Sequence, residues 1–137
     1  MSDATRWMVG LLFIAIPTIA FGGYFLLSIL RRNAGTEGIT DVQRTYFRAG
    51  HAHAGVLVIL ALVGQFALDY ARLSEFVVWA LRIGLVIAPL LISGGFFGGA
   101  PRTPEGKPTS LILLVPIGAV VLGVTTVGVG VGLLVSG

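Results

Sequence analysis

The sequence predicts an all-α integral membrane protein, a four-transmembrane-helix bundle in a single domain that covers residues 1–137. Hydrophobic residues make up 55% of the chain and charged residues 11%, and the mean hydropathy is +0.96. A soluble domain averages about 25% charged residues, so this chain lacks the polar surface that faces water. The apolar residues also lie in four long blocks, which is typical of helices that cross a bilayer.

The composition also excludes several classes of function. The chain has no cysteine, so it has no disulfide, thiolate nucleophile or zinc–thiolate site. Its net charge is +3, but the basic residues are scattered over several loops and form no stripe for nucleic acid. We therefore expect membrane lipids with anionic headgroups, and no nucleic acid, as partners of these charges.

The first predicted helix covers about residues 7–30. Its apolar block is longer than the core of a signal peptide, and Arg31 and Arg32 follow it directly. We therefore expect a retained transmembrane helix, with Trp7 at the membrane interface and a kink at Pro17.

The second predicted helix covers about residues 41–70, after a loop at residues 33–39. Thr40 and Gln43 have the spacing of a capping box, in which the Thr40 hydroxyl accepts from an early backbone N–H and Gln43 reaches back to the cap. The apolar part, residues 49–68, has about the 20 residues that a transmembrane helix needs.

The third and fourth helices are predicted at about residues 75–99 and 110–135. Residues 71–74 are too few for more than a tight turn, so helices two and three are expected to be antiparallel neighbours. Residues 100–109 are rich in proline and charge and form the next loop. Pro89 lies inside the third helix, and Pro116 lies near the start of the fourth.

The distribution of positive charge predicts the orientation. Residues 31–48 and 100–109 carry most of the basic residues, and the positive-inside rule places both segments in the cytoplasm and both termini outside. We expect the protein in a bacterial inner membrane. The basic residues of the two segments are Arg31, Arg32, Arg44, Arg48, Arg102 and Lys107.

Glycines at four-residue spacing predict closely packed helices. Such a pair lies on one helix face and lets another backbone approach in a medium that provides no hydrophobic drive between helices. We expect packing within the bundle, and the alternative is a subunit interface or a contact with a larger partner. The pairs are Gly94 with Gly98, Gly95 with Gly99, and Gly128 with Gly132.

Three polar residues are predicted inside the membrane or at its edge. Arg82 lies about two turns into the third helix, where an unpaired charge is costly. Asp69 is expected at a similar depth across the tight turn, so the sequence predicts a structural Asp69–Arg82 pair, with a ligand or proton role as the alternative. Gln65 is expected to bond between helices.

His51 and His53 are two residues apart, and on a helix such residues point about 200° from one another. They cannot hold one metal ion together, so we predict no metal site, although they are the candidate ligands. His51 shares a helix stripe with Arg44 and Arg48, whereas His53 falls on the other side with Gly50. Packing or interfacial roles are the first interpretation. Haem bound across an oligomer and a proton or ion path are alternatives.

The segment Arg44–His51, which reads RTYFRAGH, is similar to the Arg-x-x-Arg-Ala-His run of the MAPEG family of membrane-associated glutathione and eicosanoid enzymes. Four helices in a chain of about this length are a further similarity. The resemblance implies that Arg44, Arg48 and His51 help to hold glutathione at a trimer interface. The sequence departs from the family because Gly50 interrupts the run and the asparagine and glutamate that follow in the family are missing.

The sequence as a whole favours a non-catalytic subunit or accessory protein that packs in a homo-oligomer or with other membrane subunits, with no cofactor. The basis is that no complete catalytic constellation can be assembled from a chain with no cysteine and six acidic residues. Two alternatives stay open. One is a MAPEG-like oligomeric enzyme that binds glutathione or a lipid-like anion at the cytoplasmic start of helix two, and the other is a small channel or transporter.

Overall fold

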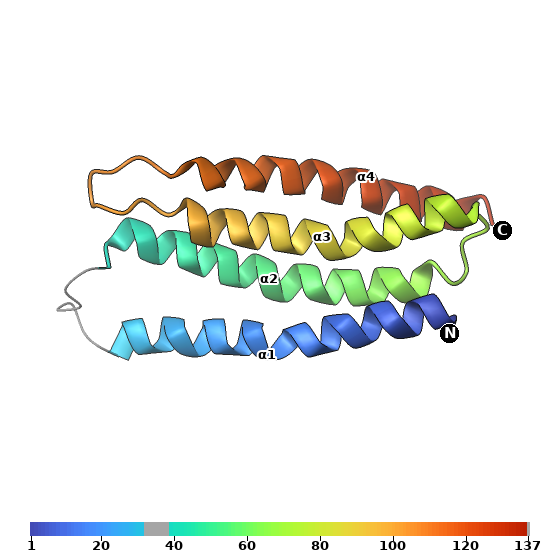
Figure 1. Ribbon diagram of the computed structural model, residues 1–137, viewed down its shortest axis with the longest axis horizontal. Coiled ribbons are helices and arrows are strands. Elements are labelled where there is room, and N and C mark those ends of the chain that lie inside the picture. Colours follow the sequence, from blue (N-terminus) through green and yellow to red (C-terminus); the bar gives the residue numbers. More distant parts are fainter. Residues whose placement is uncertain (32–38, 137) are drawn as a thin grey trace.

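The computed structural model describes residues 1–31 and 39–136, and these residues form four long helices and no strand (Figure 1). Each of the four is long and apolar enough to cross a membrane, which confirms the predicted all-α, four-helix class. The helices are α1 (Asp3–Arg31), α2 (Asp41–Ala67), α3 (Glu75–Gly99) and α4 (Leu114–Leu134), and a 3₁₀ turn, η1 (Ser110–Leu113), precedes α4.

Helix α1 begins at Asp3, about one turn before the predicted start at residue 7. Its direction changes midway along its length (Figure 1). Pro17 lies inside the helix and cannot donate the backbone hydrogen bond that a regular helix would have there, which accounts for a bend in this region. Residues 32–38, which include the predicted basic residue Arg32, lie outside the described residues.

Helix α2 begins with the predicted capping box. The Thr40 Oγ1 atom accepts a hydrogen bond from the Gln43 backbone N–H at 3.1 Å, and the Gln43 Oε1 atom accepts one from the Thr40 backbone N–H at 2.9 Å. The Gln43 amide nitrogen also donates to the carbonyl oxygen of Pro101 at 2.7 Å. This last bond attaches the connection between α3 and η1 to the start of α2.

The end of α2 differs from the prediction. The helix ends at Ala67 rather than at about residue 70, and the connection to α3 is accordingly longer than the predicted residues 71–74. The backbone N–H groups of Asp69 and Tyr70 donate to carbonyls three residues earlier, at 3.1 Å each, so the chain tightens into a turn. Helices α2 and α3 are antiparallel neighbours, as the short connection predicted (Figure 1).

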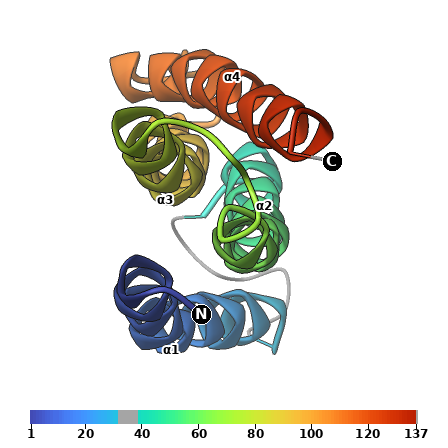
Figure 2. The ribbon, with the colours of Figure 1, turned by 90° about the vertical axis from the view of Figure 1, so that its right-hand side faces the viewer.

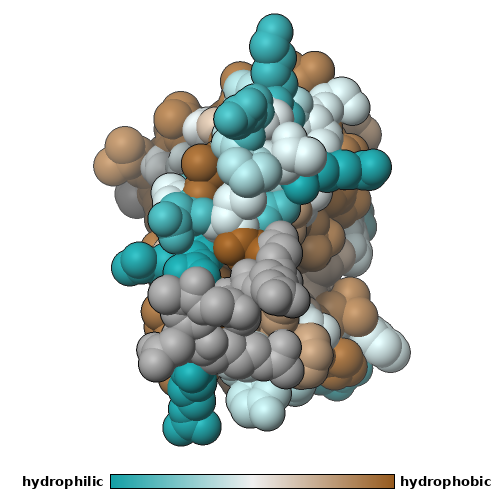
Figure 3. All heavy atoms as spheres, turned by 90° about the vertical axis from the view of Figure 1, so that its left-hand side faces the viewer, coloured by the Kyte–Doolittle hydropathy of each residue, from teal (hydrophilic) through white to brown (hydrophobic). Residues whose placement is uncertain are grey.

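The four helices do not surround one common axis. Figure 2 shows α1 and α4 on opposite sides of the α2–α3 pair, and no contact is found between α1 and α4. The start of α1 and the end of α4 lie at the end of the molecule that carries the α2–α3 turn (Figure 1). The end of α1, the start of α2 and the connection between α3 and η1 lie at the other end, where hydrophilic side chains gather (Figure 3).

Glycines bring α3 and α4 into close contact. A Cβ atom at Gly95 would lie 2.7 Å from Val115, one at Gly128 would lie 2.6 Å from Leu81, and one at Gly132 would lie 2.6 Å from Leu73. Gly98 and Gly99 lie in the same way against Leu111 and Ile112 of η1. These five of the six predicted glycines therefore have neighbours within this chain.

Gly94 is the exception among the predicted glycines. A Cβ atom at Gly94 would have no atom within 4 Å, so the expectation that Gly94 packs together with Gly98 is wrong. Glycines outside the predicted pairs also bring α3 and α4 together, because Gly84 lies against Thr125 and Gly118 lies against Leu91 and Ile92.

Candidate functional site

A group of five polar residues joins the start of α1 to the facing ends of α2 and α3. Arg82 lies at its centre and is 2% exposed. Its Nη1 atom donates to Thr5 Oγ1 at 2.7 Å and to Gln65 Oε1 at 3.0 Å, and its Nη2 atom donates to Asp69 Oδ1 at 2.9 Å. The five residues, called the Arg82 network, are Ser2, Thr5, Gln65, Asp69 and Arg82.

The Arg82 network contains the ion pair that the sequence predicted between Asp69 and Arg82. It also contains the predicted bond from Gln65 to another helix, because the Gln65 Nε2 atom donates to the Arg82 carbonyl oxygen at 3.0 Å. Thr5 and Ser2 were not predicted, because they precede the apolar block that marked the first helix. Thr5 is fully buried, and its hydroxyl donates to Asp69 Oδ1 at 2.6 Å.

The hydrogen bonds of this network keep the Asp69 carboxyl group ionised. Burial of this side chain, which is 14% exposed, would by itself raise the pKa of the carboxyl group. Hydrogen bonds from Thr5, Ser2 and Arg82 favour the ionised form and outweigh the burial, so the pKa of Asp69 lies well below its usual range. The network therefore pairs a carboxylate with a guanidinium, which suits a structural role.

Arg44 and Arg48 lie at the opposite end of α2, beside the last turns of α1. They line a cleft of about 470 Å³, called the arginine cleft, together with Asp41 and the apolar side chains of Leu26, Ile29 and Leu30. The Asp41 carboxylate lies 3.4 Å from Arg44 Nη1. The arginine cleft thus combines two guanidinium groups with one carboxylate.

His51 does not belong to the arginine cleft, so the predicted three-residue site of Arg44, Arg48 and His51 is not assembled in one place. The imidazole ring of His51 instead lies against α1 at Gly22 and Gly23, where an added Cβ atom would be 3.2–3.3 Å from the ring. The His51 side chain lies one turn farther along α2 than Arg48, and at that level glycines let α1 come close.

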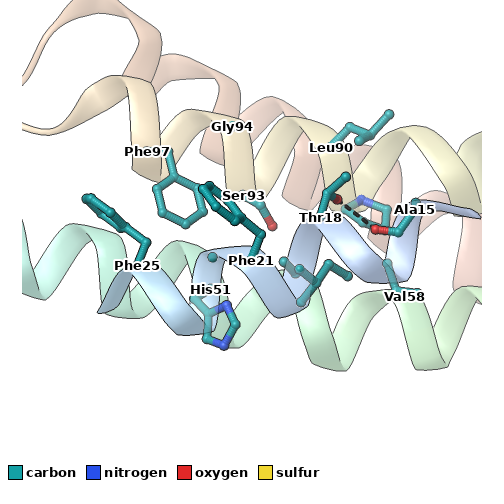
Figure 4. Close-up of a pocket in the computed structure, with 14 residues that line it drawn as sticks. Ala15, Thr18, Phe21, Phe25, His51, Val58, Leu90, Ser93, Gly94 and Phe97 are labelled. Atoms are coloured by element: carbon teal, nitrogen blue, oxygen red, sulfur yellow. Dashed lines mark hydrogen bonds between the residues drawn. The ribbon is translucent and has the colours of Figure 1, made fainter. Parts of the chain in front are cut away.

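His51 lines a second cleft, which α1, α2 and α3 form together. This three-helix cleft has a volume of about 430 Å³, and its lining is mostly apolar. Figure 4 shows the rings of Phe21, Phe25 and Phe97 grouped in it, with Ser93 beside Phe21 and His51 at the edge of the group. Thr18 also lines the cleft, but its hydroxyl donates to the Ala15 carbonyl oxygen. His51 and Ser93 are therefore the polar side chains of this lining that make no hydrogen bond within the described residues.

Ser93 was missed in the sequence. It lies in an apolar block, four residues after Pro89 and directly before Gly94. A hydroxyl in such a proline- and glycine-containing segment was the feature of the sequence that could have identified it. The Ser93 side chain is 9% exposed. Within the described residues, its hydroxyl has no hydrogen-bond partner.

His53 lies on the other side of α2, as the helical geometry predicted. Its Nδ1 atom is 2.7 Å from the Ala49 carbonyl oxygen, and its ring centroid lies 5.1 Å from that of Phe96 on α3. Residues 1–31 and 39–136 contain no group of three or more histidine, cysteine or acidic side chains placed to hold a metal ion. The two histidines are thus in separate environments.

Comparisons with protein-family models, with curated proteins and with solved structures find no match to this chain.

Proposed function

We propose that the protein is a small integral membrane protein that acts as a non-catalytic subunit or accessory protein in an oligomer or a larger membrane complex. The observation that supports this most is the open arrangement of the helices. Over its 29 residues, α1 buries only Thr5, Leu12 and Ile29, and α4 lies on the far side of the α2–α3 pair (Figure 2). Both outer helices leave a long apolar face available to partner helices.

The outer face of α1 is the surface that we assign to a partner. Its large side chains include Phe13 and Ile14, which are 59% and 75% exposed. Most glycines of α3 and α4 already pack within the chain, so they are not the basis of this proposal. Packing of a further helix against α1 would rest on van der Waals contact, which drives helix association in lipid.

A cross-linking experiment tests this proposal, because the chain has no cysteine of its own. Ile14→Cys places one thiol on the outer face of α1, and Ala61→Cys, at a position that is 1% exposed, is the buried control. In native membranes, a bifunctional maleimide should join the Ile14→Cys protein to a second copy or to another membrane protein and leave the control unjoined. Recovery of both variants as lone monomers, with no partner in a native-membrane pull-down, would contradict the proposal.

The arginine cleft supports a second candidate function, the binding of an anion such as glutathione or a lipid-like anion, as in the MAPEG-like alternative. Its guanidinium groups face the same space beside α1, and arginine is well suited to hold carboxylate or phosphate groups. Because His51 lines another cleft, we assign the site to Arg44 and Arg48 alone.

Glutathione binding to the purified protein tests this second candidate. Arg48→Ala should weaken binding about tenfold or more, since a charged hydrogen bond contributes about 1.5–3 kcal/mol. His51→Ala and the exposed-loop variant Arg102→Ala are the controls and should bind as the native protein does. Equal binding by Arg48→Ala would remove the arginine cleft as the site.

A further inference from the structure

We propose that the three-helix cleft is a binding site for a neutral, ring-bearing lipid of the quinone class, whose oxygen atoms hydrogen-bond to Ser93 and His51. This site is independent of the proposed subunit function and of the arginine cleft. Four features support it: the unpaired hydroxyl of Ser93, the placement of the His51 ring, the aromatic walls, and the absence of a charged side chain among the residues that line the cleft.

The hydroxyl of Ser93 differs from three other helix hydroxyls of this chain. The hydroxyls of Thr18, Ser28 and Thr126 donate to carbonyl oxygens of their own helices, at 2.6, 2.7 and 2.8 Å. Ser93 makes no such bond and has no other partner within the described residues, although only 9% of the residue is exposed. A buried hydroxyl without a partner is costly, so this group is available to a ligand in the cleft.

The ring of His51 is the second polar group at the cleft. Gly22 and Gly23 allow it to lie directly against α1, because a Cβ atom at either position would come within 3.3 Å of the ring. Among the described residues, no hydrogen bond is found to either ring nitrogen. A neutral imidazole offers one donor and one acceptor, so His51 can bind a carbonyl or a hydroxyl oxygen of a ligand.

The walls of the cleft favour a flat, uncharged ring. Phe21, Phe25 and Phe97 present aromatic rings in it (Figure 4), and aromatic rings stack on planar conjugated groups. A volume of about 430 Å³ falls within the usual range of about 300–1,000 Å³ for small-molecule sites. An anionic headgroup would find no cationic side chain in this lining, and a plain acyl chain would leave Ser93 without a partner.

Membrane quinones combine the required properties. They have a flat ring with two carbonyl oxygens and a long apolar tail. Phe21 is 70% exposed at the edge of the cleft, so the cleft is open on the side where lipid surrounds the helices. The ring would lie between α1 and α3, and the tail would extend through this opening into the bilayer.

Binding of decylubiquinone, a short-tailed quinone, to the full chain in lipid nanodiscs tests the proposal. Ser93→Ala removes the hydroxyl at nearly constant volume, and His51→Phe removes the nitrogens while keeping a ring. Each should raise the Kd about 3- to 10-fold, the effect of one neutral hydrogen bond. Native protein that fails to bind decylubiquinone, or variants with unchanged Kd, would overturn the proposal.

A steric variant tests the location of the site separately. Gly94 lines the cleft and has no neighbour within 4 Å of an added Cβ atom, so Gly94→Leu adds a side chain to the cleft from an uncrowded position. We expect Gly94→Leu to weaken binding more than tenfold. The matched control is Gly123→Leu on α4, which also has no such neighbour and should bind as the native protein does. Equal binding by both glycine variants would place the quinone elsewhere and overturn the proposal.

A molecule without oxygen atoms distinguishes a hydrogen-bonded ring from a merely apolar occupant. Decylbenzene has a similar ring and tail but no carbonyl group, so we expect it to compete with decylubiquinone at least threefold less well. If decylbenzene competes equally and Ser93→Ala binds normally, the cleft holds apolar chains only and the quinone assignment is wrong.

Discussion

Arg82 carries a buried positive charge, and residues from two other helices and a turn bind its two terminal nitrogen atoms. A charge at this depth is tolerated when it is paired and faces the interior of a bundle. Thr5, Gln65 and Asp69 provide this pairing, with donor–acceptor distances of 2.7–3.0 Å to the guanidinium group. Arg82 therefore holds the start of α1 against the other helices.

Replacement of Arg82 should destabilise the protein strongly. Arg82→Met removes the guanidinium group that lies 2.9 Å from the Asp69 carboxylate and leaves only the N-terminal ammonium group, at 3.9 Å, as a counter-charge. Removing one member of a buried pair costs about 3–5 kcal/mol. Unfolding in mixed SDS and dodecyl maltoside micelles, followed by circular dichroism, measures the change. Arg6→Met is the control, because the Arg6–Asp3 pair is exposed and such pairs contribute about 0–1 kcal/mol. Equal losses in both variants would contradict the structural role of Arg82.

The stability of the folded chain should fall at acidic pH because of Asp69. The folded-state pKa of this carboxyl group is depressed, whereas an unfolded aspartate titrates at about pH 3.9. The contribution of Asp69 is therefore complete above about pH 5 and is lost as the pH falls below about 4, where the unfolded chain takes up the proton first. Asp69→Asn should be less stable at pH 7 and should show a smaller loss between pH 7 and 3. A loss of the same size in both proteins would exclude Asp69 as its source.

At the scale of single residues, the partner of a buried charged side chain could be predicted from the sequence. Arg82 and Asp69 could be paired because a buried charge needs an opposite charge at the same depth. Ser93 could not be assigned, because a hydroxyl in a transmembrane helix normally bonds to its own backbone. Only the structure distinguishes Ser93 from Thr18 and Ser28, which make such bonds.

At the scale of helices, glycine determines how closely α3 and α4 approach. A Cβ atom at Gly118 would lie 2.7 Å from Ile92 Cγ1 and 3.0 Å from the Ile92 backbone nitrogen. The backbone atom cannot move independently of α3, so any side chain at Gly118 must push the two helices apart. The contact therefore depends on the absence of a side chain at this position.

Two alanine substitutions on α4 test this dependence. Gly118→Ala should destabilise the protein by about 1–3 kcal/mol, the usual cost of overpacking. Gly123→Ala, where an added Cβ atom has no neighbour within 4 Å, should be neutral or slightly stabilising, because alanine is the better helix former. Thermal unfolding in detergent distinguishes the two. A Gly118→Ala protein as stable as the native protein would show that α4 can shift without cost.

Helix positions could be predicted well, and helix neighbours could not. The apolar blocks, the Thr40 capping box and the prolines locate the helices within a few residues. In a membrane protein, however, the lipid-facing and protein-facing sides of a helix are both apolar, so periodicity does not identify the contacting face. For this reason Gly84 and Gly118 were overlooked, and Gly94 was assigned to a contact that it does not make.

At the scale of the whole molecule, the two ends of the bundle differ in charge. The end that carries the connection between α3 and η1 contains Arg44, Arg48, Arg102 and Lys107 and shows many hydrophilic side chains (Figure 3). The proposed orientation, with this end in the cytoplasm, follows from the positive-inside rule. The open order of the helices was not predictable, because nothing in the sequence relates α1 to α4.

Single-cysteine labelling in intact cells tests the proposed orientation. Glu75→Cys and Glu105→Cys are both exposed substitutions at opposite ends of the bundle. A membrane-impermeant maleimide should label Glu75→Cys in intact cells and should label Glu105→Cys only after the cells are broken. The reverse pattern would show that the protein has the opposite orientation.

The order of the Arg82 network along the chain bears on how the protein is made. The Arg82 guanidinium group donates hydrogen bonds to Thr5, Gln65 and Asp69. These residues precede Arg82 in the sequence by 77, 17 and 13 residues. During synthesis, each of them leaves the ribosome before the arginine does. Every group that pairs with this cation is therefore synthesised before the arginine itself, so Arg82 never has to wait for a partner that the ribosome has yet to make.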